Sequence, residues 1–255
     1  MRALLPLVLL TACRAAPAWE AVGGFELLPE AETWREVKVA QLEGWLAEAG
    51  ERLAPVRDYT ATLETRERIG DELFPRRVMQ VKVREQPLAV AIVTLEPPSE
   101  AGQRVWYDEA RGRKLVAETP GFLGTLVGRV SLDPRGARAM QNRRHPITDT
   151  GLARLLAQVE EKFHPALARR SAPRLRSTEL PFGDGRLRVV DALVPSEPPD
   201  PPLVHRLGFA TDSGLLTYYG MAELLPEGLA LVEEYGYRDL ALSPGLSDEA
   251  FAPEK

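Results

Sequence analysis

The chain alternates apolar and polar residues over many short segments, and this pattern constrains its fold more than any other feature. From Val56 to Glu118 the period is two, which is typical of strands that bury one face. The turns between these runs, such as Gly70-Asp71, leave too little sequence for the crossover helices that join parallel strands. The pattern resumes from Arg174 to Leu242, so we expect about ten short strands joined as antiparallel meanders.

Two segments show the spacing of an amphipathic helix instead. The first, Thr33–Ala54, carries apolar residues every three to five positions, a Thr and a Glu at capping-box spacing at its start, and a proline just after its end. The second, Gly151–Phe163, has a similar apolar stripe, and Asp149 or Thr150 is placed to cap its start.

A sheet with this many strands tends to curl, and its helices belong on one face. The predicted fold class is therefore α+β. It consists of a strongly curved antiparallel sheet, a half-barrel of about ten or eleven strands, with two main helices packed on the concave face.

The N-terminus has the pattern of an export signal. Arg2 precedes an apolar run, residues 3–10, that ends in Leu10-Thr11-Ala12-Cys13, and this arrangement resembles a bacterial lipoprotein signal with its lipobox. Cys13 is the only cysteine, so it has no disulfide partner, and acylation of its thiol explains its position. We expect a signal peptide over residues 1–12, an acylated tether over 13–32 and a single half-barrel domain over 33–255.

Two other readings of this segment stay open. Ala16-Pro17-Ala18 has the small-x-small pattern of ordinary secretory cleavage, which would give a soluble periplasmic or secreted protein. Residues 1–18 are also compatible with an unstructured start of a cytosolic protein. Arg14, rather than Asp, follows Cys13, as in signals directed to the outer membrane. We therefore expect a protein of the cell envelope, held at the outer membrane facing the periplasm by its N-terminal acyl chains.

Several blocks carry a family resemblance. The most specific is Asn142-Arg143-Arg144-His145-Pro146-Ile147, and Val130–Gly136, Gly102–Tyr107 and Tyr237–Phe251 accompany it. Together they resemble an uncharacterised bacterial family of exported proteins, domain of unknown function 1571, although an extra Arg stands between Asn and His. The layout is in turn similar to the lipoprotein carriers LolA and LolB and to LppX. That similarity implies an apolar cavity for acyl chains, and it carries over no functional residue.

Sites of chemistry are sparse. The three histidines lack the clustered spacing of a zinc site, and neither a phosphate loop nor a nucleophile elbow occurs, so we expect no metal, no cofactor and no enzymatic activity. One polar group of residues has two readings: it holds an anion beside a helix start, or it is a structural turn. Its members are Arg143, Arg144, His145 and Asp149.

Apolar side chains on the helices and in one glycine-rich segment are candidates for lining a lipid cavity, although such stripes also form plain core. They are Trp34, Trp45, Phe122, Leu126, Leu152 and Leu155.

The formal net charge of -5 lacks the basic surplus of a nucleic-acid-binding protein, so no nucleic-acid partner is expected. The expected function is that of a monomeric, membrane-anchored, non-enzymatic envelope lipoprotein that binds a lipid, a lipoprotein or another hydrophobic ligand in the half-barrel cavity. One alternative is a structural or adaptor lipoprotein that binds another envelope protein. A further alternative is a periplasmic hydrolase.

Overall fold

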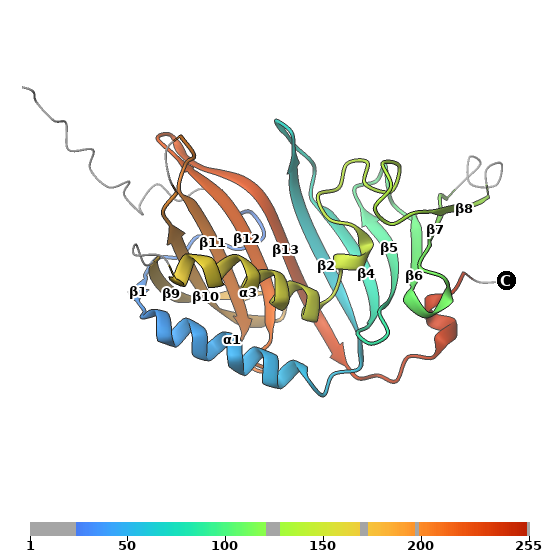
Figure 1. The fold of residues 1–255 in the computed structure, drawn as a ribbon, viewed down its shortest axis with the longest axis horizontal. Coiled ribbons are helices and arrows are strands. Elements are labelled where there is room, and N and C mark those ends of the chain that lie inside the picture. Colours follow the sequence, from blue (N-terminus) through green and yellow to red (C-terminus); the bar gives the residue numbers. More distant parts are fainter. Residues whose placement is uncertain (1–23, 121–127, 169–172, 197–198, 254–255) are drawn as a thin grey trace, which may run out of the picture.

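In the residues that the computed structural model describes, thirteen strands form one antiparallel sheet, which curves around two helices (Figure 1). The structure describes residues 24–120, 128–168, 173–196 and 199–253. In spatial order the strands are β1 (Arg35–Glu36), β9 (Arg174–Phe182), β10 (Gly185–Val194), β11 (Leu203–Ala210), β12 (Leu216–Leu225), β13 (Gly228–Leu242), β2 (Asp58–Ile69), β4 (Arg77–Arg84), β5 (Ala89–Glu96), β6 (Arg104–Asp108), β7 (Leu115–Glu118) and β8 (Arg129–Leu132), with β3 (Glu72–Leu73) paired to β2 beside this path.

The sheet is unclosed, because β1 and β8 form its two ends and do not pair with each other within the described residues. In the middle of the sheet, β13, the last strand in the sequence, pairs with β2, the first long strand. In this pairing Glu233 lies opposite Glu67, and Tyr237 lies opposite Leu63. The predicted curved antiparallel sheet with two helices is confirmed. The strand number exceeds ten or eleven partly because β1 and β3 have two residues each, too few to show a period of two.

The helices α1 (Val39–Leu53) and α3 (Leu152–Ala168) lie in the concavity, across the half of the sheet formed by β9 to β13 (Figure 1). The described part of the chain also forms three 3₁₀ turns: η1 (Glu109–Arg111), η2 (Ile147–Asp149) and η3 (Asp248–Phe251).

The predicted start of the first helix at Thr33 is wrong. Residues Arg35 and Glu36 pair with β9 as strand β1, and the Val37 N–H donates to the Leu175 carbonyl at 3.2 Å. The helix begins only at Val39. Just before it, the Lys38 N–H donates a hydrogen bond to the Gln41 side-chain oxygen at 2.9 Å. Pairing with a strand edge gives the backbone groups of 35–37 partners that the local capping pattern does not reveal.

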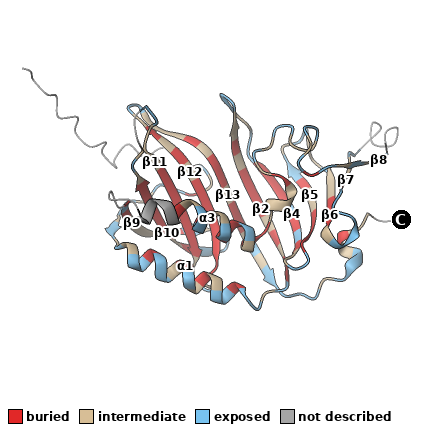
Figure 2. Cartoon of the chain, viewed as in Figure 1, coloured by how far each residue is buried: buried red, intermediate tan, exposed pale blue. Residues whose placement is uncertain are grey.

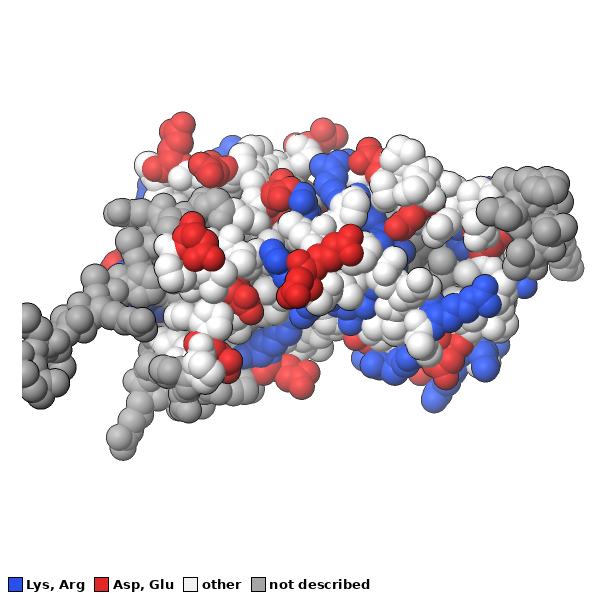
Figure 3. Space-filling model, turned by 90° about the horizontal axis from the view of Figure 1, so that it is seen from above, with Lys and Arg blue, Asp and Glu red and all other residues white. Residues whose placement is uncertain are grey.

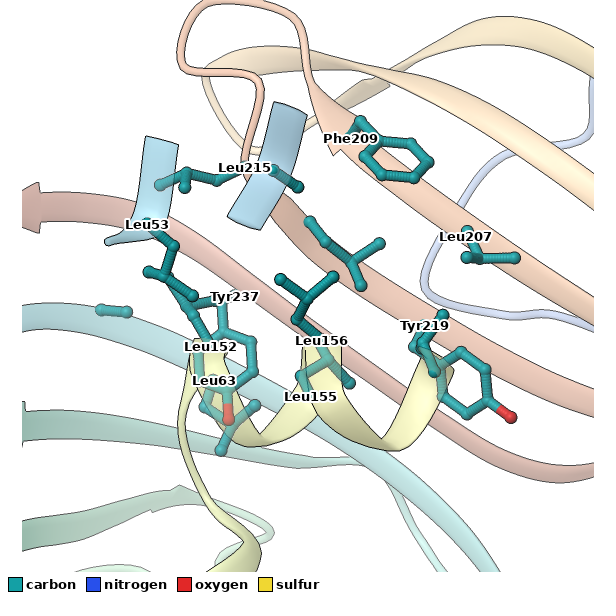
Figure 4. Close-up of a cluster of buried hydrophobic side chains, with 14 of the residues drawn as sticks. Leu53, Leu63, Leu152, Leu155, Leu156, Leu207, Phe209, Leu215, Tyr219 and Tyr237 are labelled. Atoms are coloured by element: carbon teal, nitrogen blue, oxygen red, sulfur yellow. The ribbon is translucent and has the colours of Figure 1, made fainter. Parts of the chain in front are cut away.

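Leucines of both helices fill the space between the helices and this half of the sheet. Figure 4 shows Leu155 and Leu156 of α3 in one cluster with Leu207 of β11 and Tyr219 of β12, and Figure 2 shows the buried stripes on the strands beneath. The residues buried from the helices are Leu42, Leu46, Ala49, Leu53, Leu152, Leu155, Leu156, Val159 and Phe163. Under the helices the concavity therefore holds packed core.

The opposite, convex face of this half is covered by residues 24–34, here called the strap. Phe25 and Leu28 are buried against the strands, and the N–H groups of Glu26 and Leu27 both donate to the Glu234 carboxylate at 3.0 Å. Antiparallel sheets commonly leave one face to water, whereas this half is covered on both faces. The last part of the predicted tether, from Phe25 onward, thus packs on the domain.

Candidate ligand-binding cavity

A cavity of about 270 Å³ lies in the half of the concavity that α1 and α3 leave uncovered. Its floor is the concave face of β2 and of β4 to β8, where every second residue points inward. The apolar floor residues are Leu63, Met79, Ile92, Val105, Leu115, Ala117 and Leu132. This volume is just below the ~300 Å³ at which ordinary small-molecule sites begin.

The roof is the segment between β8 and α3, residues 133–150. Asp133 starts it with an Asx turn, because its carboxylate accepts the Arg135 N–H at 2.9 Å and its carbonyl accepts the Gly136 N–H at 3.0 Å. Further turns fold the segment back over the strands, and Pro134, Ala139 and Ile147 line the cavity from above. The loop is thus compact and forms a wall of the site.

A side wall comes from β13 and α3. Tyr235 and Tyr237 of β13 line the cavity, together with Leu155 and Gln158 of α3. Leu155 therefore faces both the core and the cavity, and the first turns of α3 separate the packed half of the concavity from the open half.

The start of α3 is held by side chains of β2 and β13 and of the turn after β4. The Gly151 N–H donates to the Tyr237 hydroxyl at 3.1 Å, the Leu152 N–H to the Tyr59 hydroxyl at 2.7 Å, and the Ala153 N–H to a Glu85 carboxylate oxygen at 3.3 Å. The predicted cap from Asp149 or Thr150 is therefore wrong, because distant side chains reach these N–H groups.

A buried carboxylate links the roof to β13 and α3. Glu233, with 1% of its side chain exposed, accepts from Arg144 at 3.0 Å, from Lys162 at 2.8 Å, and lies 2.9 Å from His145 Nε2. Burial alone raises the pKa of Glu233, but the hydrogen bond from His145 and the charge of Lys162 outweigh it and hold that pKa below the usual range. The carboxylate is therefore ionised and ties the roof to β13 and α3.

Two further carboxylates continue this network. Glu67 accepts from the Tyr235 hydroxyl at 2.6 Å and from the Arg144 N–H at 3.3 Å. Glu100 accepts two hydrogen bonds from Arg77, at 2.8 and 3.0 Å, and the nearest nitrogen of Arg143 is 3.8 Å from it. The predicted polar group of the roof is thus brought against acidic residues of β2, of β13 and of the β5–β6 turn.

The four residues of that predicted group differ in their partners. Arg144 and His145 bind Glu233, while Arg143 faces the cavity. Asp149 also lines the cavity, and its carboxylate accepts from Arg135 at 3.1 Å, with His145 Nδ1 at 3.7 Å. Sequence reasoning missed Glu67, Glu100 and Glu233, because nothing in a strand's local pattern shows which loop will lie across it.

The structure also places the predicted apolar lining. Leu155 lines the cavity, but Leu152 does not, because it is 1% exposed in the core. Trp45 packs near Phe209 under Arg188, outside the cavity, with ring centroids 6.3 Å apart. Trp34 lies on the convex side, where it stacks on Arg176. Phe122, Leu126 and Cys13 lie outside the described residues.

A second hollow, of about 610 Å³, lies on the other side of the α3 start, next to the end of α1. It has a far larger share of charged lining residues, among them Arg57, Asp58, Arg84, Glu85 and Glu160. The cavity under residues 133–150 has the more continuous apolar surface, which makes it the better candidate for a ligand site.

Other kinds of site find no support in the described part of the chain. No group of three His, Cys, Asp or Glu residues there is placed to hold a metal ion. None of the described helices has the length and apolarity to cross a membrane. Seen from above, the molecule shows acidic and basic side chains interspersed rather than gathered into a field of one sign (Figure 3).

Comparison with known proteins adds a family and a set of similar structures. Residues 56–255 match the model of a family described as "Protein of unknown function (DUF1571)", and no curated protein matches the chain. Lipoprotein LppX of Mycobacterium tuberculosis is similar at 11% identity and a TM-score of 0.48, over 82% of this chain and 99% of that one. An outer membrane lipoprotein-sorting protein domain from Vibrio parahaemolyticus is similar at 14% identity and a TM-score of 0.39, over 82% and 96%.

Proposed function

This chain belongs to the DUF1571 family of proteins of unknown function, and we propose that its domain binds a hydrophobic ligand in the cavity under residues 133–150. The apolar floor of that cavity carries the proposal. The apolar side chains of the floor stay in contact with solvent while no ligand covers them, and removing apolar surface from water gains about 25 cal/mol per Å². A hydrocarbon chain that lies along the floor obtains this gain.

We propose further that the protein is an envelope lipoprotein anchored through Cys13 at the outer membrane, facing the periplasm. The lipobox supports this location, with release after Ala18 as its soluble alternative. Gly24, where the strap begins against Leu229, follows Cys13 by 11 positions. At ~3.3–3.6 Å per residue such a tether reaches at most about 40 Å, so an acylated Cys13 holds the cavity near the bilayer.

The proposed function is non-enzymatic and the protein monomeric. Around the cavity, the carboxylates of Glu67, Glu100 and Glu233 each accept a hydrogen bond from an arginine or a tyrosine hydroxyl. The imidazole of His145 lies 2.9 Å from the Glu233 carboxylate. A hydrolase needs a nucleophile beside a base with a free acceptor atom. The ion pairs support a structural role for these groups instead.

Native mass spectrometry of the full chain carrying Cys13→Ser, purified without detergent, tests the binding function. We expect a non-covalent lipid adduct that organic extraction removes. Ala139→Phe places a ring in the cavity from the roof and should abolish the adduct. Ala137→Phe, two residues away, exposed and not among the cavity-lining residues, is the matched control and should retain it.

Two results would count against this function. An adduct that persists in Ala139→Phe would place the lipid elsewhere on the protein. A protein that never carries lipid, but that crosslinks in cells to one envelope protein, would support the adaptor alternative.

A further inference from the structure

One end of the cavity is polar and carries more positive than negative charge. Arg143 lines it, yet its guanidinium makes no hydrogen bond within the described residues, and its nearest carboxylate oxygen, on Glu100, is 3.8 Å away. That carboxylate already accepts hydrogen bonds from two guanidinium nitrogens of Arg77, Nε and Nη2. Arg143 therefore presents unused donors to the cavity.

The charges around Arg143 do not balance. Four cationic side chains, of Arg77, Arg143, Arg144 and Lys162, share the three carboxylates of Glu67, Glu100 and Glu233. Arg138 also lines the cavity and forms no ion pair in the described part of the chain. The Asp149 carboxylate nearby is occupied by Arg135. This local surplus of positive charge stands out in a chain whose net charge is -5.

The environment makes that surplus unfavourable unless an anion is present. Burial, followed by the charge of Arg77, lowers the pKa of Arg143. An arginine nevertheless stays protonated at neutral pH, so the site keeps a cation whose side chain is only 30% exposed to water. A planar guanidinium with free donors matches a carboxylate or a phosphate, which it binds through two parallel hydrogen bonds.

A second unpaired group lies on the floor of the cavity, on β2. The Thr65 hydroxyl is buried and has no hydrogen-bond partner among the described residues. Thr65 lines the cavity, as do the amide side chains of Gln103 and Gln141. Buried polar atoms are rarely left without a partner, so an orphaned hydroxyl in a cavity wall indicates that a ligand or water completes it.

From this arrangement we infer that the ligand is an amphipathic anion, whose carboxylate or phosphate head lies at Arg143 and Arg138 and whose hydrocarbon chain lies along the apolar floor. The inference rests on the proposed binding function and narrows it to one class of lipid. An uncharged hydrocarbon would leave Arg143 and Thr65 unsatisfied, and a free inorganic anion would leave the floor unfilled.

Calorimetric titration of the full Cys13→Ser chain, stripped of bound lipid, separates these possibilities. The probes are decanoate, decyl phosphate, decanol and inorganic phosphate. We expect the two anionic amphiphiles to bind at least about tenfold more tightly than decanol, because a hydrogen bond to a charged group is worth more than one to a neutral group. Inorganic phosphate should bind far more weakly than decyl phosphate.

Arg143→Gln should weaken decanoate binding about tenfold or more and leave decanol binding unchanged. The control is Arg52→Gln, which makes the same change of charge at an exposed residue of α1 and should alter neither affinity. Arg138→Gln, on an exposed roof residue, is the second variant if Arg143→Gln does not fold, and should also weaken decanoate selectively.

The other outcomes are each decisive. If decanol binds as tightly as decanoate, the cavity binds the hydrocarbon chain without recognising a charged head group. This inference is then wrong, while the proposed function stands. If inorganic phosphate equals decyl phosphate, the site takes a free anion and the inference is also wrong. If no amphiphile binds, both the inference and the proposed function fail.

Discussion

Leu152, the first residue of α3, donates its backbone N–H to the hydroxyl of Tyr59 on β2 at 2.7 Å. A strand thus caps a helix that follows it by more than 80 residues, and both groups are buried. Tyr237 of β13 supports the neighbouring Gly151 in the same way. The two tyrosines therefore determine where α3 begins and, through it, where the side wall of the cavity stands.

Tyr59→Phe should destabilise the domain by about 1–3 kcal/mol, because it leaves the buried Leu152 N–H without an acceptor. Urea unfolding measures the loss. Tyr107→Phe is the control, since that tyrosine is also buried in the sheet but its hydroxyl makes no hydrogen bond within the described residues. Equal effects of both substitutions would mean that packing, and not the cap, accounts for the change.

Glu233→Gln should destabilise the fold more strongly, by about 3–5 kcal/mol, because Arg144 and Lys162 would lose a buried counter-charge. Guanidinium unfolding at neutral pH measures this loss, with Glu227→Gln in the exposed β12–β13 turn as the control. The pKa of Glu233 lies below its unfolded value near 4.5, so its stabilisation is present at neutral pH and is lost progressively as the pH falls below about 4.5. A loss no larger than that of the control would mean that the ion pairs contribute little.

The buried carboxyl group of Glu234 should give the domain's free energy of unfolding an unusual dependence on pH. Burial raises the pKa of Glu234 to about 7, although the Tyr218 hydroxyl, the Leu27 N–H and Arg206 act against this. Between the unfolded value near 4.5 and about 7 the folded state holds a proton that the unfolded state has lost, so stability falls as pH rises through this window. The decline amounts to about 3 kcal/mol at 1.36 kcal/mol per pH unit.

The test compares Glu234→Gln with the wild type in urea from about pH 5 to pH 8. We expect the variant to gain stability relative to the wild type as the pH rises, because its side chain cannot ionise. His205, whose pKa burial and then Lys162 lower to about 4, gives the opposite slope between about 4 and 6.5, and it cancels in the comparison. A difference that does not vary with pH would contradict the raised pKa of Glu234.

Cys13→Ser tests the proposed anchor. We expect the variant to lose labelling by a radioactive fatty acid and to move from the membrane fraction to the soluble fraction, because the thiol that would carry the diacylglycerol is gone. The intact mass of the wild-type protein is the companion measurement. A mature chain that begins at Trp19 without lipid would establish secretory cleavage after Ala18 and overturn the anchor.

Much of the fold was predictable because it depends on local pattern. The period of two along β2 and β4 to β6, the short turns between them, and the apolar stripe from Leu152 to Phe163 all follow from neighbours a few positions apart. The Arg-His-Pro-Ile block likewise pointed to the family whose model matches residues 56–255. These features need no knowledge of which strand lies beside which.

The cavity and its charges were decided by tertiary structure alone. The pairing of β13 with β2 brings Glu233 beside Glu67, and the roof then places Arg144 between them. The competition for backbone partners moved the start of α1 from Thr33 to Val39, through the contact of Arg35 with Ser177. Periodicity records which side of a strand is buried, but what covers that side depends on contacts between residues far apart in the sequence, whose free energies no local pattern encodes.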